Sequence, residues 1–179
     1  MPSPAPLHLT LVVPASRREA TDTRLPNLEV GLARGRWARA PGKGNEACLF
    51  RLFEVALAVE DEPPVGALCR FAETGRRDGR WWVRADPVHL VADRDRVVLA
   101  ASEELDLRPE EAQSLVDAFN EHFAGDGLQL ESFDAHRWYL TADPPPRLTT
   151  TPPAGVRGAD IHDHLPRGAD APQWRAWLT

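Results

Sequence analysis

Residues 79–90 read GRWWVRADPVHL, and the predicted fold is built outward from this stretch. Trp81–Ala85 alternates with the two-residue period of a strand, so Trp82 and Arg84 share one face and the odd-numbered residues the other. The preceding Gly75–Gly79 predicts a turn. Pro87 ends the strand, because proline has no N–H to donate to a ladder.

Further strands are predicted on both sides of this one. Val88–Ala92 and Arg96–Ala100 flank Asp93-Arg94-Asp95, which predicts a hairpin. Leu128–Phe133 and Trp138–Thr141 predict a second strand pair. Leu7–Val13 is rich in β-forming residues and predicts a first strand near the start of the chain.

Two segments have the apolar spacing of amphipathic helices. Asn45–Val59 follows two glycines and is stopped by Asp61-Glu-Pro-Pro64. Pro109–Phe123 opens on proline and two glutamates, which suit a helix N-terminus. Val65–Ala72 is predicted as a short strand or a helical turn. We therefore expect an α+β fold, with a mostly antiparallel sheet and the two main helices packed on one face.

Composition divides the chain into three parts. Residues 1–142 are predicted to form the α+β domain. Residues 143–159 begin with DPPPRLTTTPP and predict a Pro-rich linker or extended arm. Residues 160–179 predict the start of a C-terminal segment that is cut before its natural end, because a helix pattern opening at Asp170 and Pro172 is still running at Thr179.

Charge and cysteine content narrow the class of protein. The formal net charge of −6 argues against a general nucleic-acid binder and against an anionic membrane surface. No apolar run approaches the roughly 20 residues of a membrane helix, and the N-terminus lacks the basic region of a signal peptide. The two cysteines, Cys48 and Cys69, have no metal-binding spacing. We expect a cytoplasmic protein.

The first candidate site is a set of cations, imidazoles and a carboxylate at strand ends. Arg84, Asp86 and His89 lie within six positions, and arginine can hold a phosphate or carboxylate with two hydrogen bonds. His136 and Arg137 in a predicted turn could join Arg84 around an anion. The alternative is a set of solvated surface ion pairs, which contribute little.

The second candidate is a metal site in the tail. His162 and His164 have an H-x-H spacing, which places both imidazoles on one face of an extended strand, and Asp160 could be a third ligand for a divalent metal. The alternative is a polar loop. Apart from this possible metal, no cofactor is expected, because the chain lacks a complete phosphate-binding loop and the G-x-S-x-G elbow of a hydrolase.

The segment 81–140, WWVRADPVHLVADRDRVVLA…LRPEEAQSLVDAFNEHF…LQLESFDAHRWYL, resembles the RpfE-type regulatory proteins of gammaproteobacteria, and the tail GADIHDHLPRGADAPQWRAWL also fits. The label phosphoglycerate mutase is common in that family. Archaeal-type cofactor-independent phosphoglycerate mutases carry an inserted substrate domain with similar features. Arg84 is similar to its first arginine, Pro109–Ala112 to its helix opening and Arg137 to its turn arginine. Asp160 and His164 are similar to the ends of its last motif, from which residues 161–163 depart.

This resemblance implies a descendant of the substrate-binding insert without the metal-dependent catalytic domain. It implies a non-catalytic regulatory protein that binds a small phosphorylated metabolite. Two alternatives remain open. One is a mutase-like phosphotransferase or metal-dependent phosphohydrolase. The other is a scaffold that docks to a protein partner through Trp174 and Trp177. These tryptophans could instead belong to a core helix that has lost its packing partner.

Overall fold

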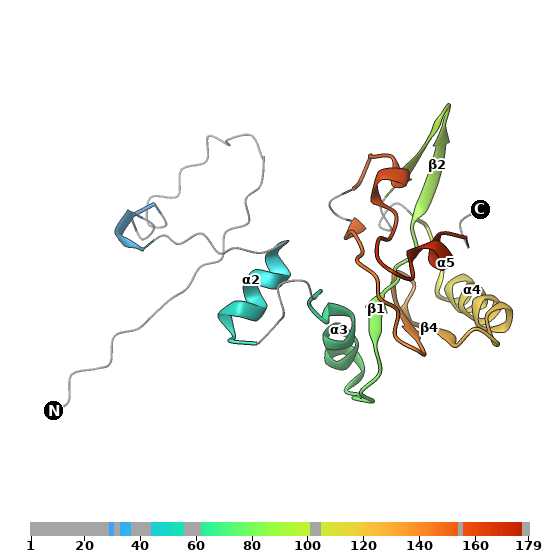
Figure 1. Cartoon of the computed structure of the whole chain (residues 1–179), viewed down its shortest axis with the longest axis horizontal. Helices are drawn as coiled ribbons and strands as arrows, with labels where there is room; N and C mark the ends of the chain where they lie inside the picture. Colours follow the sequence, from blue (N-terminus) through green and yellow to red (C-terminus); the bar gives the residue numbers. More distant parts are fainter. Residues whose placement is uncertain are drawn as a thin grey trace. The chain divides into compact units, whose positions relative to one another are not determined.

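The computed structural model describes residues 29–30, 33–36, 44–55, 62–100, 105–153 and 156–176 (Figure 1). The chain forms two compact units, Met1–Pro63 and Pro64–Thr179, and each is described by itself. In the first unit, α2 spans Gly44–Leu52. It is shorter than predicted, since Glu54 takes a left-handed φ of 56° that cannot continue a helix. The predicted strand Leu7–Val13 lies outside the described residues.

A three-stranded antiparallel sheet forms the centre of the second unit. Its strands are β1 (Trp82–Arg84), β4 (Leu128–Asp134) and β5 (Arg137–Ala142), in the order β1-β5-β4. Leu140 on β5 lies between Val83 and Leu130. The sheet confirms the predicted α+β class with antiparallel strands.

A second, two-stranded sheet confirms the predicted hairpin. β2 (His89–Asp93) pairs with β3 (Arg96–Ala100) across a two-residue loop whose first residue, Arg94, has a φ of 54°. The other side of β3 contacts the C-terminal segment, because Val98 bridges to Asp160. The hairpin therefore has one occupied edge, that of β3.

Helix α4 (Pro109–His122) covers one face of the three-stranded sheet. Pro109 occupies its first turn, and Glu111 caps its start by accepting from the Arg108 backbone N–H at 3.0 Å and from the Arg108 guanidinium at 2.6 Å. Its apolar stripe packs on alternate residues of β4 and β5. The buried cluster consists of Ala112, Val116, Leu128, Leu130, Ala135, Trp138, Leu140 and Ala142.

Helix α3 (Val65–Thr74) covers the opposite face, over β1 (Figure 1). Within the second unit, α3 and α4 therefore lie on opposite faces of the sheet, and the predicted helix Asn45–Val59 corresponds to α2 of the first unit. A Cβ on Gly66 would lie 2.5 Å from the Trp82 carbonyl oxygen, so glycine allows this close approach. Arg70 is buried against the sheet, whereas Leu68 and Phe71 are exposed. This reversed amphipathicity explains why the segment is not predicted as a helix.

The tail is tied back to the second unit. Thr149 and Arg167 exchange two backbone hydrogen bonds of 2.7 and 3.0 Å, and the Arg147 N–H donates to Asp170 at 2.7 Å. The predicted linker 143–159 therefore falls within this unit. A 3₁₀ helix, η3 (Ile161–His164), and the short α5 (Ala171–Ala176) follow. None of the described helices is long and apolar enough to cross a bilayer.

Candidate functional site

Arg84 and Asp86 form a two-pronged ion pair at the end of β1. The Arg84 Nε donates to Asp86 Oδ1 at 3.0 Å, and its Nη2 contacts Oδ2. The same Oδ1 accepts from the backbone N–H of Trp138 at 3.0 Å. Asp86 therefore joins the end of β1 to β5, and it neutralises the arginine that was expected to hold an anion.

Arg137 is held by two carboxylates. Its Nη1 donates to Glu73 on α3 at 2.7 Å, and its Nε donates to Asp134 at 2.7 Å. The hydrogen bond from Arg137 holds the pKa of Asp134 below its usual range. Because Arg84 pairs in register with Tyr139, Arg84 and Arg137 do share a face of the sheet. Each already has its own counter-charge there.

The two predicted histidines make no hydrogen bond or ion pair with these arginines among the described residues. His89 is exposed at the start of β2, in the other sheet. His136 occupies the β4–β5 turn, where its Nδ1 is buried and has no hydrogen-bond partner among the described residues. The five residues predicted from the sequence thus divide into an ion pair, an arginine bound to two carboxylates, and two separate imidazoles.

Sequence reasoning missed the polar residues by which α3 meets the sheet. Arg70, with a side chain 5% exposed, pairs with Glu131 at 2.9 Å and with Asp78 at 3.3 Å, and its guanidinium lies 3.9 Å from the Trp82 ring centroid. Glu73 accepts from the Tyr139 hydroxyl. Burial raises the pKa of Tyr139, and the hydrogen bond to Glu73 raises it further. The spacing of Gly66, Arg70 and Glu73, at one helical face, was the available signal.

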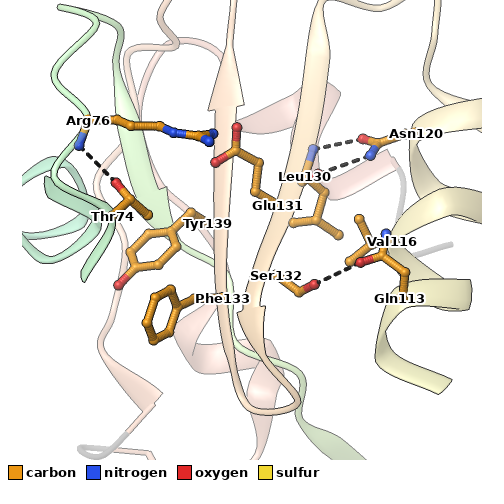
Figure 2. A pocket seen from close by; sticks show the side chains of 10 residues that line it. All are labelled: Thr74, Arg76, Gln113, Val116, Asn120, Leu130, Glu131, Ser132, Phe133 and Tyr139. Atoms are coloured by element: carbon orange, nitrogen blue, oxygen red, sulfur yellow. Dashed lines mark hydrogen bonds between the residues drawn. The ribbon is translucent and has the colours of Figure 1, made fainter. Parts of the chain in front are cut away.

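Beside this network the sheet carries a hollow of about 500 Å³, here called the β4 hollow (Figure 2). Its walls come from the end of α3 and the residues after it, from α4, and from strands β4 and β5. The lining residues are Thr74, Arg76, Gln113, Val116, Asn120, Leu130, Glu131, Ser132, Phe133 and Tyr139. Figure 2 shows Glu131 and Phe133 on the Tyr139 side of β4, and Leu130 and Ser132 turned toward α4.

Arg76 distinguishes the β4 hollow electrostatically. Its backbone N–H donates to Thr74, but in the part of the chain that the structure describes its guanidinium has no carboxylate partner. The other charged wall, Glu131, is already compensated by Arg70. Among the described residues the hollow therefore carries one positive charge without a carboxylate partner, and Figure 2 shows it at the Glu131 end, with Phe133 beyond Tyr139.

The tail residues do not form the expected strand. Ile161–His164 is a 3₁₀ helix, so the premise that His162 and His164 project from one face of an extended strand is wrong. Asp160 caps this helix by accepting from the His162 N–H at 3.1 Å, and it also contacts the His162 Nδ1 at 2.7 Å. Within the described ranges, no three His, Cys, Asp or Glu side chains are grouped to hold a metal.

Trp174 is part of the second unit's packing. Its ring meets Trp81 edge-on at a centroid distance of 6.4 Å, and it packs against the buried cluster. The Trp174 ring is therefore engaged within the second unit. Trp177, the other predicted docking residue, lies outside the described residues.

No known protein family, curated protein or solved structure matches this chain.

Proposed function

We propose that this chain is a non-catalytic regulatory protein of the cytoplasm that binds a small phosphorylated acid in the β4 hollow. The class of ligand follows from the resemblance to a substrate-binding insert. The position follows from one observation: Arg76 lines the hollow without a carboxylate partner in the described chain, whereas Arg70, Arg84 and Arg137 each have one.

The chemistry of the lining suits a small anion with a short carbon chain. A guanidinium presents donors in the planar geometry that phosphate and carboxylate oxygens accept. The exposed ring of Phe133 offers an apolar wall. A volume of about 500 Å³ is within the range of about 300–1,000 Å³ typical of small-molecule sites.

This proposal gives Arg84 and Arg137 a supporting role. Arg137 links β5 to α3 through Glu73, and Arg84 holds Asp86, which accepts from the Trp138 N–H. A ligand that displaced either arginine would leave carboxylates without a counter-charge on a partly buried sheet face, which is unfavourable. We therefore assign Arg84 and Arg137 to holding the end of β1, β5 and α3 together beside the hollow.

The test is calorimetric titration of the full chain with 3-phosphoglycerate and with inorganic phosphate. Arg76→Ala is expected to weaken binding by about tenfold or more, the value of a lost hydrogen bond to a charged group. Arg77→Ala is the matched control, because it removes the same charge from the adjacent exposed position and Arg77 does not line the hollow. It is expected to leave affinity within about twofold, since exposed charges act weakly.

Two results would overturn this proposal. One is the absence of binding heat with either compound. The other is a loss of binding in Arg84→Ala or Arg137→Ala while Arg76→Ala binds normally, in variants whose circular dichroism shows a retained fold. That outcome would move the ligand to the two arginines that the sequence singles out.

A further inference from the structure

In the part of the chain that the structure describes, strand β2 has a free outer edge. It pairs there only with β3, in a two-stranded sheet. Residues 158–160 occupy the other side of β3, where the Leu99 N–H and C=O both bond to them. Four of the five β2 residues are exposed, and Leu90 and Val91 are 41% and 43% exposed.

The two-residue loop identifies which backbone groups of β2 face outward. In such hairpins the residues flanking the loop, here Asp93 and Arg96, form a hydrogen-bonded pair. Pairing then alternates along the strand, so Val91 and His89 also bond inward to β3. Leu90 and Ala92 consequently direct their N–H and C=O groups away from β3.

The edge of β2 differs from the edge of β4, which the protein closes. At β4 the side-chain amide of Asn120 binds both backbone groups of Leu130, so no further strand can use them. β2 contains neither proline nor lysine, two of the residues that commonly blunt a free edge. A strand edge that is free, apolar and unprotected by such residues is suited to the addition of another strand.

We propose that β2 pairs antiparallel with β2 of a second copy of this chain, about a two-fold axis at Val91. This register places Leu90 opposite Ala92 of the second copy, so all the outward-facing groups of both residues are paired. A register centred between two residues is excluded, because it would set an outward-facing residue against an inward-facing one.

Charge selects this register from the remaining ones. Pairing centred on Val91 sets His89 opposite Asp93 of the second copy, twice by symmetry, and so joins the only two polar residues of the strand. Centring on Leu90 or Ala92 separates this pair and shortens the overlap. Asp93 also accepts from Arg96 of its own hairpin at 2.8 Å, which leaves its second carboxylate oxygen for the imidazole.

The first experiment is light scattering of the full chain during size exclusion. We expect a dimer, and a monomer for Val91→Lys, because the two lysines would lie directly opposite each other on the axis. Leu115→Lys is the matched control, since it adds the same charge at an exposed apolar position on α4, and it is expected to stay dimeric. A monomeric wild type, or equal behaviour of the two variants, would refute the pairing.

The second experiment tests the register by cross-linking. In a Cys48→Ser, Cys69→Ser background, Val91→Cys is expected to form an intermolecular disulfide on mild oxidation. Leu90→Cys and Ala92→Cys are not, because in this register neither residue lies opposite its own copy and their Cα atoms exceed the roughly 7 Å limit for a disulfide. Cross-linking at residue 90 or 92, without cross-linking at 91, would contradict the proposed axis.

Discussion

The Asn120 side chain on α4 donates to the Leu130 carbonyl at 2.9 Å and accepts from the Leu130 N–H at 2.8 Å. One amide thus satisfies both outward-facing backbone groups at the centre of an edge strand. It also fixes the helix along the strand, because an amide can make both bonds only in one alignment.

Replacing Asn120 with alanine is expected to lower the free energy of unfolding by about 1–3 kcal/mol, since two partly buried backbone groups lose their partners. Urea denaturation followed by circular dichroism measures this change. Gln113→Ala, about two turns away and exposed, removes an amide that bonds only to side chains and is expected to have an effect within about 0.5 kcal/mol. Equal losses in both variants would contradict the role given to Asn120.

Tyr139 is the single tyrosine of the chain, so its ionisation can be followed directly by ultraviolet difference absorbance. Burial, with the hydrogen bond to Glu73, raises the pKa of this hydroxyl. We expect no phenolate signal from the folded protein near pH 10, where an unfolded tyrosine is half ionised, about its reference pKa of 10. A midpoint near pH 10 while the far-ultraviolet spectrum stays native would contradict the buried position.

The raised pKa of Tyr139 also sets the sign of a stability effect. The folded state favours the protonated hydroxyl, so this contribution is fully present below about pH 10 and is lost as pH rises above it. The free energy of unfolding should therefore fall with pH in this range, and fall less steeply in Tyr139→Phe. The tyrosine contribution can be recognised because lysines also titrate near pH 10 and Lys43 is the only lysine of the chain.

Gly66 marks the closest approach of α3 to β1. A Cβ at this position would lie 2.5 Å from the Trp82 carbonyl oxygen and 2.6 Å from the Val83 Cα, both backbone atoms that cannot move aside separately. Gly66→Ala is expected to destabilise the protein by about 2 kcal/mol or more through overpacking. Gly125→Ala is the control, because a Cβ there meets no atom within 4 Å. Thermal unfolding of both variants measures the difference.

Arg70 is expected to tolerate lysine poorly. Its guanidinium bonds to both oxygens of Glu131 and reaches Asp78, and a single ammonium cannot reproduce this geometry. Both carboxylates are about one-third exposed and can recover some hydration, so we expect Arg70→Lys to cost about 1–2 kcal/mol. Arg76→Lys, at a cation without a carboxylate partner in the described residues, should be neutral. Chemical denaturation distinguishes the two.

The local patterns of the sequence were sufficient for most strands and for α4. Alternation located β1, β4 and β5 because each has one face in the apolar core, and Asp93-Arg94-Asp95 marked the β2–β3 turn. Helix α3 was missed for the opposite reason. Its inward side chains include Arg70 and Glu73 and its outward ones include Phe71, so its hydrophobic pattern does not indicate the face that packs.

The candidate site was predictable only in part. Parity along β1 and β5 places Arg84 and Arg137 on one face, and both were identified from the sequence. The carboxylates that neutralise these arginines were not predicted. Glu73, for example, is 64 positions from Arg137 and belongs to the helix that was missed. The β4 hollow depends on where α3 ends and where α4 lies, which are tertiary facts that no local pattern contains.

The order of strands in the central sheet has a consequence for how the chain folds. β4 and β5 are adjacent in sequence and α4 precedes them directly. The pairing of β1 with β5, in contrast, joins residues as far apart in sequence as Val83 and Leu140. Closing the longer loop costs more entropy, so we expect α4, β4 and β5 to assemble before the transition state and β1 with α3 to join after it. Leu130→Ala should then slow refolding, while Val83→Ala should mainly speed unfolding. The close contact at Gly66 would then form after the transition state, so it would affect the unfolding rate and not the folding rate.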